Sequence, residues 1–111
     1  MKGCDEMIDR LETSADALWL TPQTPGVVRL GFADNGRELV GPVKRLTWQT
    51  QSGRVNLGDP FLIVEGTKET VVLRFPLAGR IKQINPDLVA HPEWLDTHND
   101  ARDWMVDLDD E

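Results

Sequence analysis

Residues 55–81 read VNLGDPFLIVEGTKETVVLRFPLAGRI, and they carry the clearest strand pattern of the chain. It contains two strongly apolar runs, 61–64 and 71–75, joined by a short polar connection at 65–70 that includes a glycine. Apolar runs joined in this way are typical of a β-hairpin. Lys68 lies near the middle of the connection. We therefore expect its side chain to project into solvent from a turn whose two arms belong to the core.

Further short strand patterns, separated by turn residues, occupy most of the remaining chain. We expect strands at 17–20, 27–32, 43–48, 80–85 and 104–106, a turn region at 49–59, and a loop or a single helical turn at 33–39. From Pro86 to residue 103 the sequence predicts short helical turns instead. Short strands at this spacing are typical of an all-β sandwich or barrel.

The 111 residues allow one modest hydrophobic core. We expect an N-terminal extension at 1–16, a domain at 17–107 and an acidic tail at 108–111. The extension carries four apolar residues at roughly helical spacing, namely Met7, Ile8, Leu11 and Ala15, which predicts a short helix attached to the domain and outside its core. The residues from Asp107 onward are expected to be frayed.

The net charge of −7 argues against nucleic acid as a partner and favours docking against basic protein surfaces. Cys4 is the only cysteine, so no internal disulfide can form and nothing indicates an oxidising compartment. No apolar run approaches the roughly 18 residues of a membrane span. Charged residues interrupt the N-terminal segment where a signal peptide would be apolar. We therefore expect a cytoplasmic protein without a membrane partner.

The region around Lys68 resembles the lipoyl and biotinyl domain family. That family's pattern is a Gly-Asp turn, a strand, an acidic residue three positions before the modified lysine, a second strand and a Pro-x-x-Gly turn. The matching residues here are Gly58-Asp59, 61–64, Glu65, Lys68, 71–75, and Pro76 with Gly79. The resemblance implies an all-β, flattened barrel-sandwich hybrid with short peripheral helices, and a modified lysine at position 68.

Within this family the chain is most similar to the glycine cleavage H proteins, over roughly residues 17–107. The similarity rests on Leu18-Trp19, Gly31-Phe32-Ala33, Leu39-Val40-Gly41, Asn85-Pro86-Asp87-Leu88, Pro92, Trp94-Leu95 and Trp104. Typical H proteins have Ser, Val and Ala around the lysine, where Gly66, Thr67 and Glu69 stand here, and a Gly at the position of Asp103. In these departures the chain resembles a short H-protein-like group found in some bacteria.

The resemblance implies a carrier protein and not an enzyme, with lipoic acid joined covalently to Lys68 by a lipoate-protein ligase. Glu65 and Glu69 are then candidates for recognition by a basic patch on the ligase, or are simply solvated turn carboxylates. The short group is associated with a sirtuin-type ADP-ribosyltransferase and a macrodomain hydrolase. Under that association, Asp34 and Glu38 are candidate acceptors of ADP-ribose.

Two other carrier-fold functions stay open from the sequence. One is the ordinary aminomethyl carrier that serves the glycine cleavage enzymes, and the other is an unmodified interaction module that kept the fold. Biotin is disfavoured as the attached group because biotin carriers place Met on both sides of the lysine, where Thr67 and Glu69 stand here.

Other arrangements of reactive residues carry less weight. A metal site is disfavoured in the acidic segment because no Cys joins its ligand-type residues, which are His91, Glu93, Asp96, His98 and Asp100, and because Pro92 interrupts it. We expect a solvated acidic face there. No nucleophile–base pair supports catalysis by the chain itself.

Overall fold

The structure is a computed structural model that describes residues 7–23, 25–99 and 101–109. The sequence expectations for Cys4, for Asp100 and for residues 110–111 of the acidic tail therefore lie outside the described residues. Within the described ranges no helix is long and apolar enough to cross a membrane.

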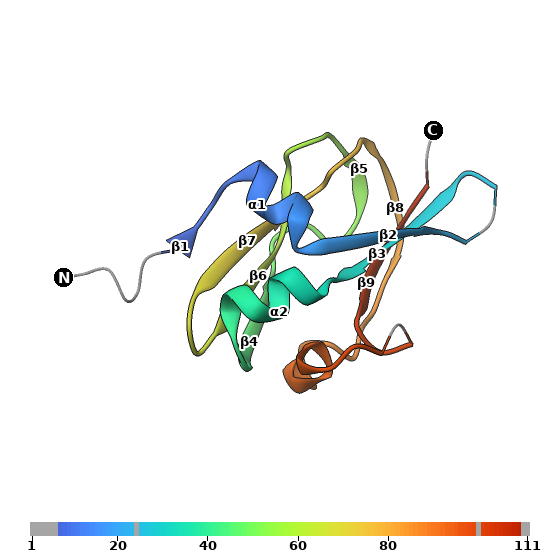
Figure 1. Cartoon of the computed structure of the whole chain (residues 1–111). Helices are drawn as coiled ribbons and strands as arrows, with labels where there is room; N and C mark the ends of the chain where they lie inside the picture. The colour runs from blue at the N-terminus through green and yellow to red at the C-terminus, as the bar shows by residue number, and fades with distance from the viewer. Residues whose placement is uncertain (1–6, 24, 100, 110–111) are drawn as a thin grey trace.

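Across the described residues the strands form two sheets, which lie one above the other with short helices at their margins (Figure 1). The four-stranded sheet has the order β1 (Met7–Ile8), β7 (Thr70–Arg74), β6 (Pro60–Gly66) and β4 (Val43–Trp48). The five-stranded sheet has the order β2 (Leu18–Pro22), β3 (Val27–Phe32), β9 (Trp104–Asp109), β8 (Gly79–Ile84) and β5 (Gly53–Val55). The peripheral helices are α1 (Leu11–Asp16), α2 (Asp34–Val40) and the 3₁₀ turn η2 (Pro92–Asp96). The expected all-β barrel-sandwich class is confirmed.

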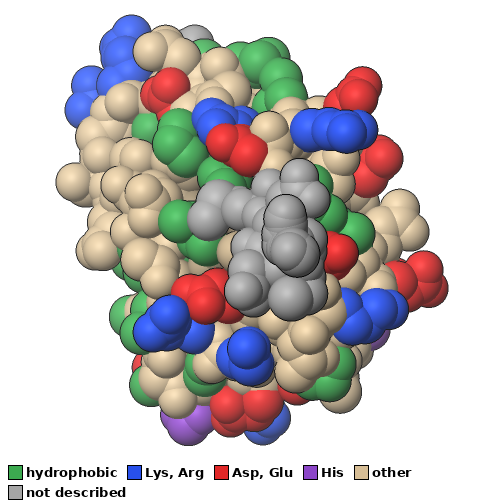
Figure 2. Space-filling model, turned by 90° about the vertical axis from the view of Figure 1, so that its left-hand side faces the viewer, with side chains coloured by type: hydrophobic (Ala, Val, Ile, Leu, Met, Phe, Trp, Pro, Cys, Tyr) green, Lys and Arg blue, Asp and Glu red, His purple; other side chains and the backbone are tan. Residues whose placement is uncertain are grey.

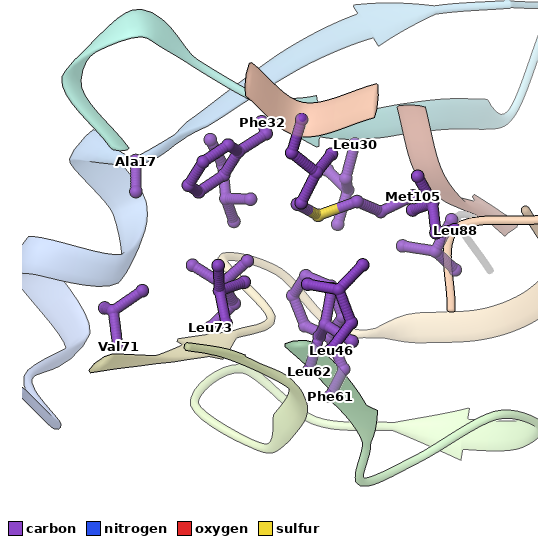
Figure 3. Packing of buried hydrophobic residues seen from close by; sticks show 14 of the residues in the cluster. Ala17, Leu30, Phe32, Leu46, Phe61, Leu62, Val71, Leu73, Leu88 and Met105 are labelled. Atoms are coloured by element: carbon purple, nitrogen blue, oxygen red, sulfur yellow. The ribbon is translucent and has the colours of Figure 1, made fainter. Parts of the chain in front are cut away.

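The core lies between the inner faces of the two sheets. Leu30, Phe32 and Met105 of the five-stranded sheet face Leu62 and Leu73 of the four-stranded sheet (Figure 3), and all five are fully buried. Facing sheets that interdigitate apolar side chains in this way gain most of their stability from burial of apolar surface. The hairpin arms β6 and β7 are therefore held firmly along their length.

The apolar run in β7 is buried on both faces because α1 packs against its outer side. Val71, Val72 and Leu73 are all at most 5% exposed. Ser14 of α1 is fully buried, and its hydroxyl accepts a hydrogen bond from the backbone N–H of Arg74 at 2.6 Å. This double coverage explains why the sequence of β7 does not alternate between apolar and polar residues.

The N-terminal segment differs in part from its expected helix. The helix begins at Leu11, whereas Met7–Ile8 is a short strand that pairs in parallel with Thr70 and Val71 of β7. The expectation of one helix from Met7 onward was therefore wrong at its first turn. A boundary at residue 17 remains a prediction.

Two further local expectations need revision. The segment expected to be a loop or one helical turn forms α2, a helix of seven residues. The turn region at 49–59 contains the short strand β5, which pairs with β8 at the edge of its sheet. Its burial pattern, with only Val55 buried, gives little periodicity by which a strand could be recognised.

The C-terminal strand continues to Asp109, so the expected fraying from Asp107 onward was wrong for residues 107–109. Asp107 is only 3% exposed, and its carboxylate accepts hydrogen bonds from Arg29 at 2.8 and 3.0 Å and from Gln83 at 2.6 Å. Burial alone would raise the pKa of Asp107, but the hydrogen bonds from Arg29 and Gln83 outweigh it and hold the pKa below its ordinary value. Partners on neighbouring strands thus keep a polar residue in the sheet.

We predict that Asp107→Asn lowers the free energy of unfolding at pH 7 by about 2–3 kcal/mol, because a hydrogen-bonded ion pair is lost. A carboxyl whose folded-state pKa is depressed stabilises the protein above its unfolded pKa of about 4 and loses this contribution as the pH falls through the folded value. Urea unfolding from pH 7 to pH 2 should therefore show the difference shrinking toward acid. The control is Asp16→Asn, which alters an exposed carboxylate on α1. A difference that stays constant down to pH 2 would contradict the assignment.

Candidate functional site

The connection between β6 and β7 is a tight turn at one end of the molecule, beside the C-terminal end of α2 (Figure 1). The backbone N–H of Gly66 donates to the carbonyl of Glu69 at 3.0 Å and closes the turn. Thr67 and Lys68 are exposed at its tip. The structure thus places Lys68 where the sequence predicts, at the end of two core strands.

Three hydrogen bonds join this turn to the end of α2. The backbone N–H groups of Lys68 and Thr67 donate to the carbonyls of Val40, at 2.8 Å, and Pro42, at 2.9 Å. The Lys68 ammonium donates to the carbonyl of Glu38 at 2.8 Å. The root of the lysine is therefore fixed by its backbone, while its side chain lies on the surface along α2.

This close approach depends on two glycines. A Cβ on Gly66 would lie 2.1 Å from the carbonyl oxygen of Val40, so any larger residue would push α2 away from the hairpin. Gly41 has a φ of +73°, a conformation that side chains rarely adopt. A Cβ there would also lie 2.9 Å from Cγ and Cδ of Lys68. Gly41 thus leaves the space in which the lysine stem lies.

Glu65, one of the two acidic residues expected to flank the lysine, forms an ion pair across the sheet. It is paired with Arg45 in the β4–β6 register, and the guanidinium donates two hydrogen bonds to its carboxylate at 2.9 and 3.2 Å. The hydrogen bond from Arg45 holds the pKa of Glu65 below its ordinary value. Glu69 is half-buried and lies next to Lys68 in the turn. The side of the molecule that carries β1 and β7 shows acidic and basic side chains interspersed (Figure 2).

Asp34 and Glu38 lie at different ends of α2. The carboxylate of Asp34, at the first turn, is bound by Arg37 and lies 3.4 Å from Nδ1 of His98. Hydrogen bonds from Arg37 and then His98 hold the pKa of Asp34 below its ordinary value. Glu38 is exposed near the last turn, and its carbonyl contacts the Lys68 ammonium. The structure therefore brings Glu38, and not Asp34, to the lysine.

The acidic segment near η2 has structural roles. His91 stacks on Trp94, with ring centroids 4.8 Å apart, and the Asp96 carboxylate accepts the backbone N–H of Val43 at 2.8 Å. In the part of the chain that the structure describes, no three potential metal ligands converge.

Sequence reasoning missed the part of the site that α2 contributes. The contacts involve backbone carbonyls, which leave no signature in residue type. The one available signal is the glycine that ends the helix at position 41, because a Gly at this place is common where a helix stops and the chain turns.

The fold is a barrel-sandwich of the lipoyl-domain type, with an exposed lysine at the tip of the β6–β7 hairpin. A family model described as "Glycine cleavage H-protein" matches residues 10–111, and the chain belongs to this family. Membership supports a carrier function rather than a catalytic one.

Individual relatives agree with this assignment. The chain is similar to the glycine cleavage system H protein of Mycobacterium tuberculosis, with 26% identity over 98 residues, covering 88% of this chain and 73% of the relative. It is also similar to a glycine cleavage system H-like protein of Chlamydia pneumoniae, with 25% identity over 89 residues, covering 80% and 77%. The solved structure of the H protein from Mycobacterium marinum matches the fold with a TM-score of 0.74 at 24% identity, covering 86% of this chain and 80% of that one.

We predict that Gly66→Ala lowers the free energy of unfolding by about 1–3 kcal/mol, because the new methyl group meets backbone and cannot be accommodated by a side-chain rotation. Urea unfolding measures the change. The matched control is Thr67→Ala, at the adjacent and exposed position, which should stay within about 0.5 kcal/mol of the parent. Equal stability of Gly66→Ala and the parent would show that α2 does not press on the hairpin.

Proposed function

We propose that this chain is an H-protein-like lipoyl carrier, with lipoic acid joined by an amide bond to Nζ of Lys68. The observation that carries the proposal is the combination of an exposed Lys68 side chain with a backbone fixed on both sides. The hairpin arms are core strands, and the turn is hydrogen-bonded to α2.

A fixed root and a flexible arm suit a group that must visit several active sites. The lysine stem and the lipoyl chain together form a long lever, and tethering raises the effective concentration of its end at each docked partner. When bound, the lipoyl dithiolane supplies the chemistry, while the protein supplies position and a docking surface. Amide formation removes the charge of one lysine and takes the net charge from −7 to −8.

The contact between Lys68 and α2 is compatible with modification. An amide nitrogen keeps one hydrogen, so the modified Nζ can still donate to the carbonyl of Glu38. The ligase must reach Nζ at the surface, where Lys68 is exposed. We propose that Glu69 and Glu65 contribute to recognition by a basic patch of the lipoate-protein ligase, with Glu69 the stronger because Arg45 already offsets the charge of Glu65.

We predict that incubation with a lipoate-protein ligase, lipoate and ATP adds the mass of one lipoyl group to the parent chain and none to Lys68→Arg. The matched controls are Lys44→Arg and Lys82→Arg, which alter exposed lysines on β4 and β8 and should be modified like the parent. Intact-mass spectrometry gives the answer. An added lipoyl mass that persists in Lys68→Arg would exclude Lys68 as the site. A folded parent that no ligase modifies would favour an unmodified interaction module.

Two sets of partner enzymes are compatible with a lipoyl carrier. The glycine cleavage enzymes are suggested by the names of the similar proteins. A sirtuin-type ADP-ribosyltransferase and a macrodomain hydrolase are favoured by the acidic residues at the site. Glu69 follows the lysine directly. Glu38 is exposed, and its backbone carbonyl accepts a hydrogen bond from Nζ of Lys68.

Of the two candidate acceptors of ADP-ribose we favour Glu38, since the Asp34 carboxylate is already bound by Arg37. We propose the second partner set, acting in the cytoplasm.

We predict that the lipoylated chain is a poor acceptor of the aminomethyl group from glycine decarboxylase, at least about tenfold slower than the lipoylated H protein of Mycobacterium tuberculosis. The physical reason is that Glu38 and Glu69 place like charges around the arm, and a misplaced charge at an interface lowers association strongly. The assay measures loading by mass at equal carrier concentration, and Glu69→Ala is the variant expected to regain part of the rate. Loading as fast as the reference carrier would assign the chain to glycine cleavage.

A further inference from the structure

Arg37 joins α2 to the segment that leads into β9. Its side chain is only 12% exposed and contacts this segment. Its Nη1 donates to the carboxylate of Asp103 at 3.2 Å, and Asp103 is fully buried. The same nitrogen lies within hydrogen-bonding distance of three backbone carbonyls, those of Phe32 at 3.2 Å and of Leu95 and Thr97 at 3.4 Å.

A guanidinium suits this set of acceptors. Its N–H groups are fixed in one plane, so the two on Nη1 are shared among Asp103 and the three carbonyls while Nε donates to Asp34 at 3.1 Å. The pair also accounts for the burial of the Asp103 side chain, which is 0% exposed. A buried carboxylate there requires a cation, and Arg37 provides it.

The same residue lies at the start of a short path to Lys68. The carbonyl of Arg37 accepts the backbone N–H of Gly41 at 2.9 Å, which closes the end of α2. The residues between them, Glu38 and Val40, provide the carbonyls that bind Nζ and the backbone N–H of Lys68. A shift of α2 would therefore move the acceptors of the hairpin directly.

We propose that Arg37, through its ion pair with Asp103, is a positioning residue for the lysine that receives the lipoyl group. It joins α2 to the segment that leads into β9, so that the α2 carbonyls hold the turn in one place. The lipoyl part of this inference rests on the proposed function, but the positioning part does not.

The test compares two pairs of substitutions, each of which removes an Arg–Asp ion pair at a different place in the fold. Arg37→Met with Asp103→Asn removes both charges together and so leaves no unpaired buried charge. The matched control is Arg29→Met with Asp107→Asn, which removes a similar buried ion pair in the five-stranded sheet and changes no residue of α2. Arg37→Lys is a milder variant that keeps the charge but loses the planar set of donors.

Two measurements are made on the full chain, at a temperature at which every variant is folded. Amide hydrogen exchange reports the protection of Thr67 and Lys68, and lipoylation by the ligase is followed at varied carrier concentration to separate kcat from KM. We expect the Arg37 pair to speed exchange at these two amides by about tenfold and to lower kcat/KM for lipoylation by a similar factor. Arg37→Lys should lie between this pair and the parent, and the Arg29 pair should leave both readouts unchanged.

The outcomes separate the inference from the proposed function. Unchanged protection of Thr67 and Lys68 in the Arg37 pair, or an equal loss in the Arg29 pair, would overturn the positioning role. If the parent is never lipoylated, the proposed function fails, and the exchange measurement still decides the role of Arg37.

Discussion

The hydrogen bonds between the end of α2 and the β6–β7 turn are the contact on which the site depends. The carbonyls of Glu38, Val40 and Pro42 each accept one hydrogen bond from Thr67 or Lys68. A hairpin turn that projects from a sheet is normally held only by its two strands, and its tip is the part that moves most. Here a third element binds the tip from the side. The lysine therefore has a defined origin and direction, although its side chain is exposed.

The rest of the fold can be understood as support for that contact. The sandwich core buries the inner faces of β6 and β7, and α1 covers the outer side of β7 through Ser14 and Arg74. These interactions fix the two strands of the hairpin. Buried ion pairs fix the other layer, with Arg29 and Asp107 joining two strands and Arg37 and Asp103 joining α2 to the start of β9. A small single domain gains positional order in this way where its apolar core alone is modest.

The sequence predicts the hairpin, the sandwich class and the place of Lys68, because each follows from local pattern. Apolar runs, glycine turns and residue spacing are all visible within 55–81. It does not predict the partner of Glu65, since Arg45 is paired with it only through the β4–β6 register across 20 residues. Where α2 stands it predicts only a loop or a single helical turn, because Gly36 weakens the helical pattern. That glycine is buried against Phe32, where a Cβ would lie 2.5 Å from the ring.

The contrast between Glu65 and Glu38 shows that the acidic position of the family pattern and the residue that contacts the lysine are not the same. Glu65 occupies the acidic position of the family pattern, yet its carboxylate is bound by Arg45 and joins two strands. Glu38 occupies no motif position, yet its backbone carbonyl accepts a hydrogen bond from the Lys68 ammonium. Lipoylation of Lys68 would replace the ammonium that donates to the backbone carbonyl of Glu38 by a neutral amide, on a hairpin tip that also carries Glu69. Under the proposed function, the modification thus changes the electrostatic character of the hairpin tip as well as attaching a reactive group. A partner enzyme with a charged docking surface can distinguish the lipoylated from the unmodified carrier before it contacts the dithiolane.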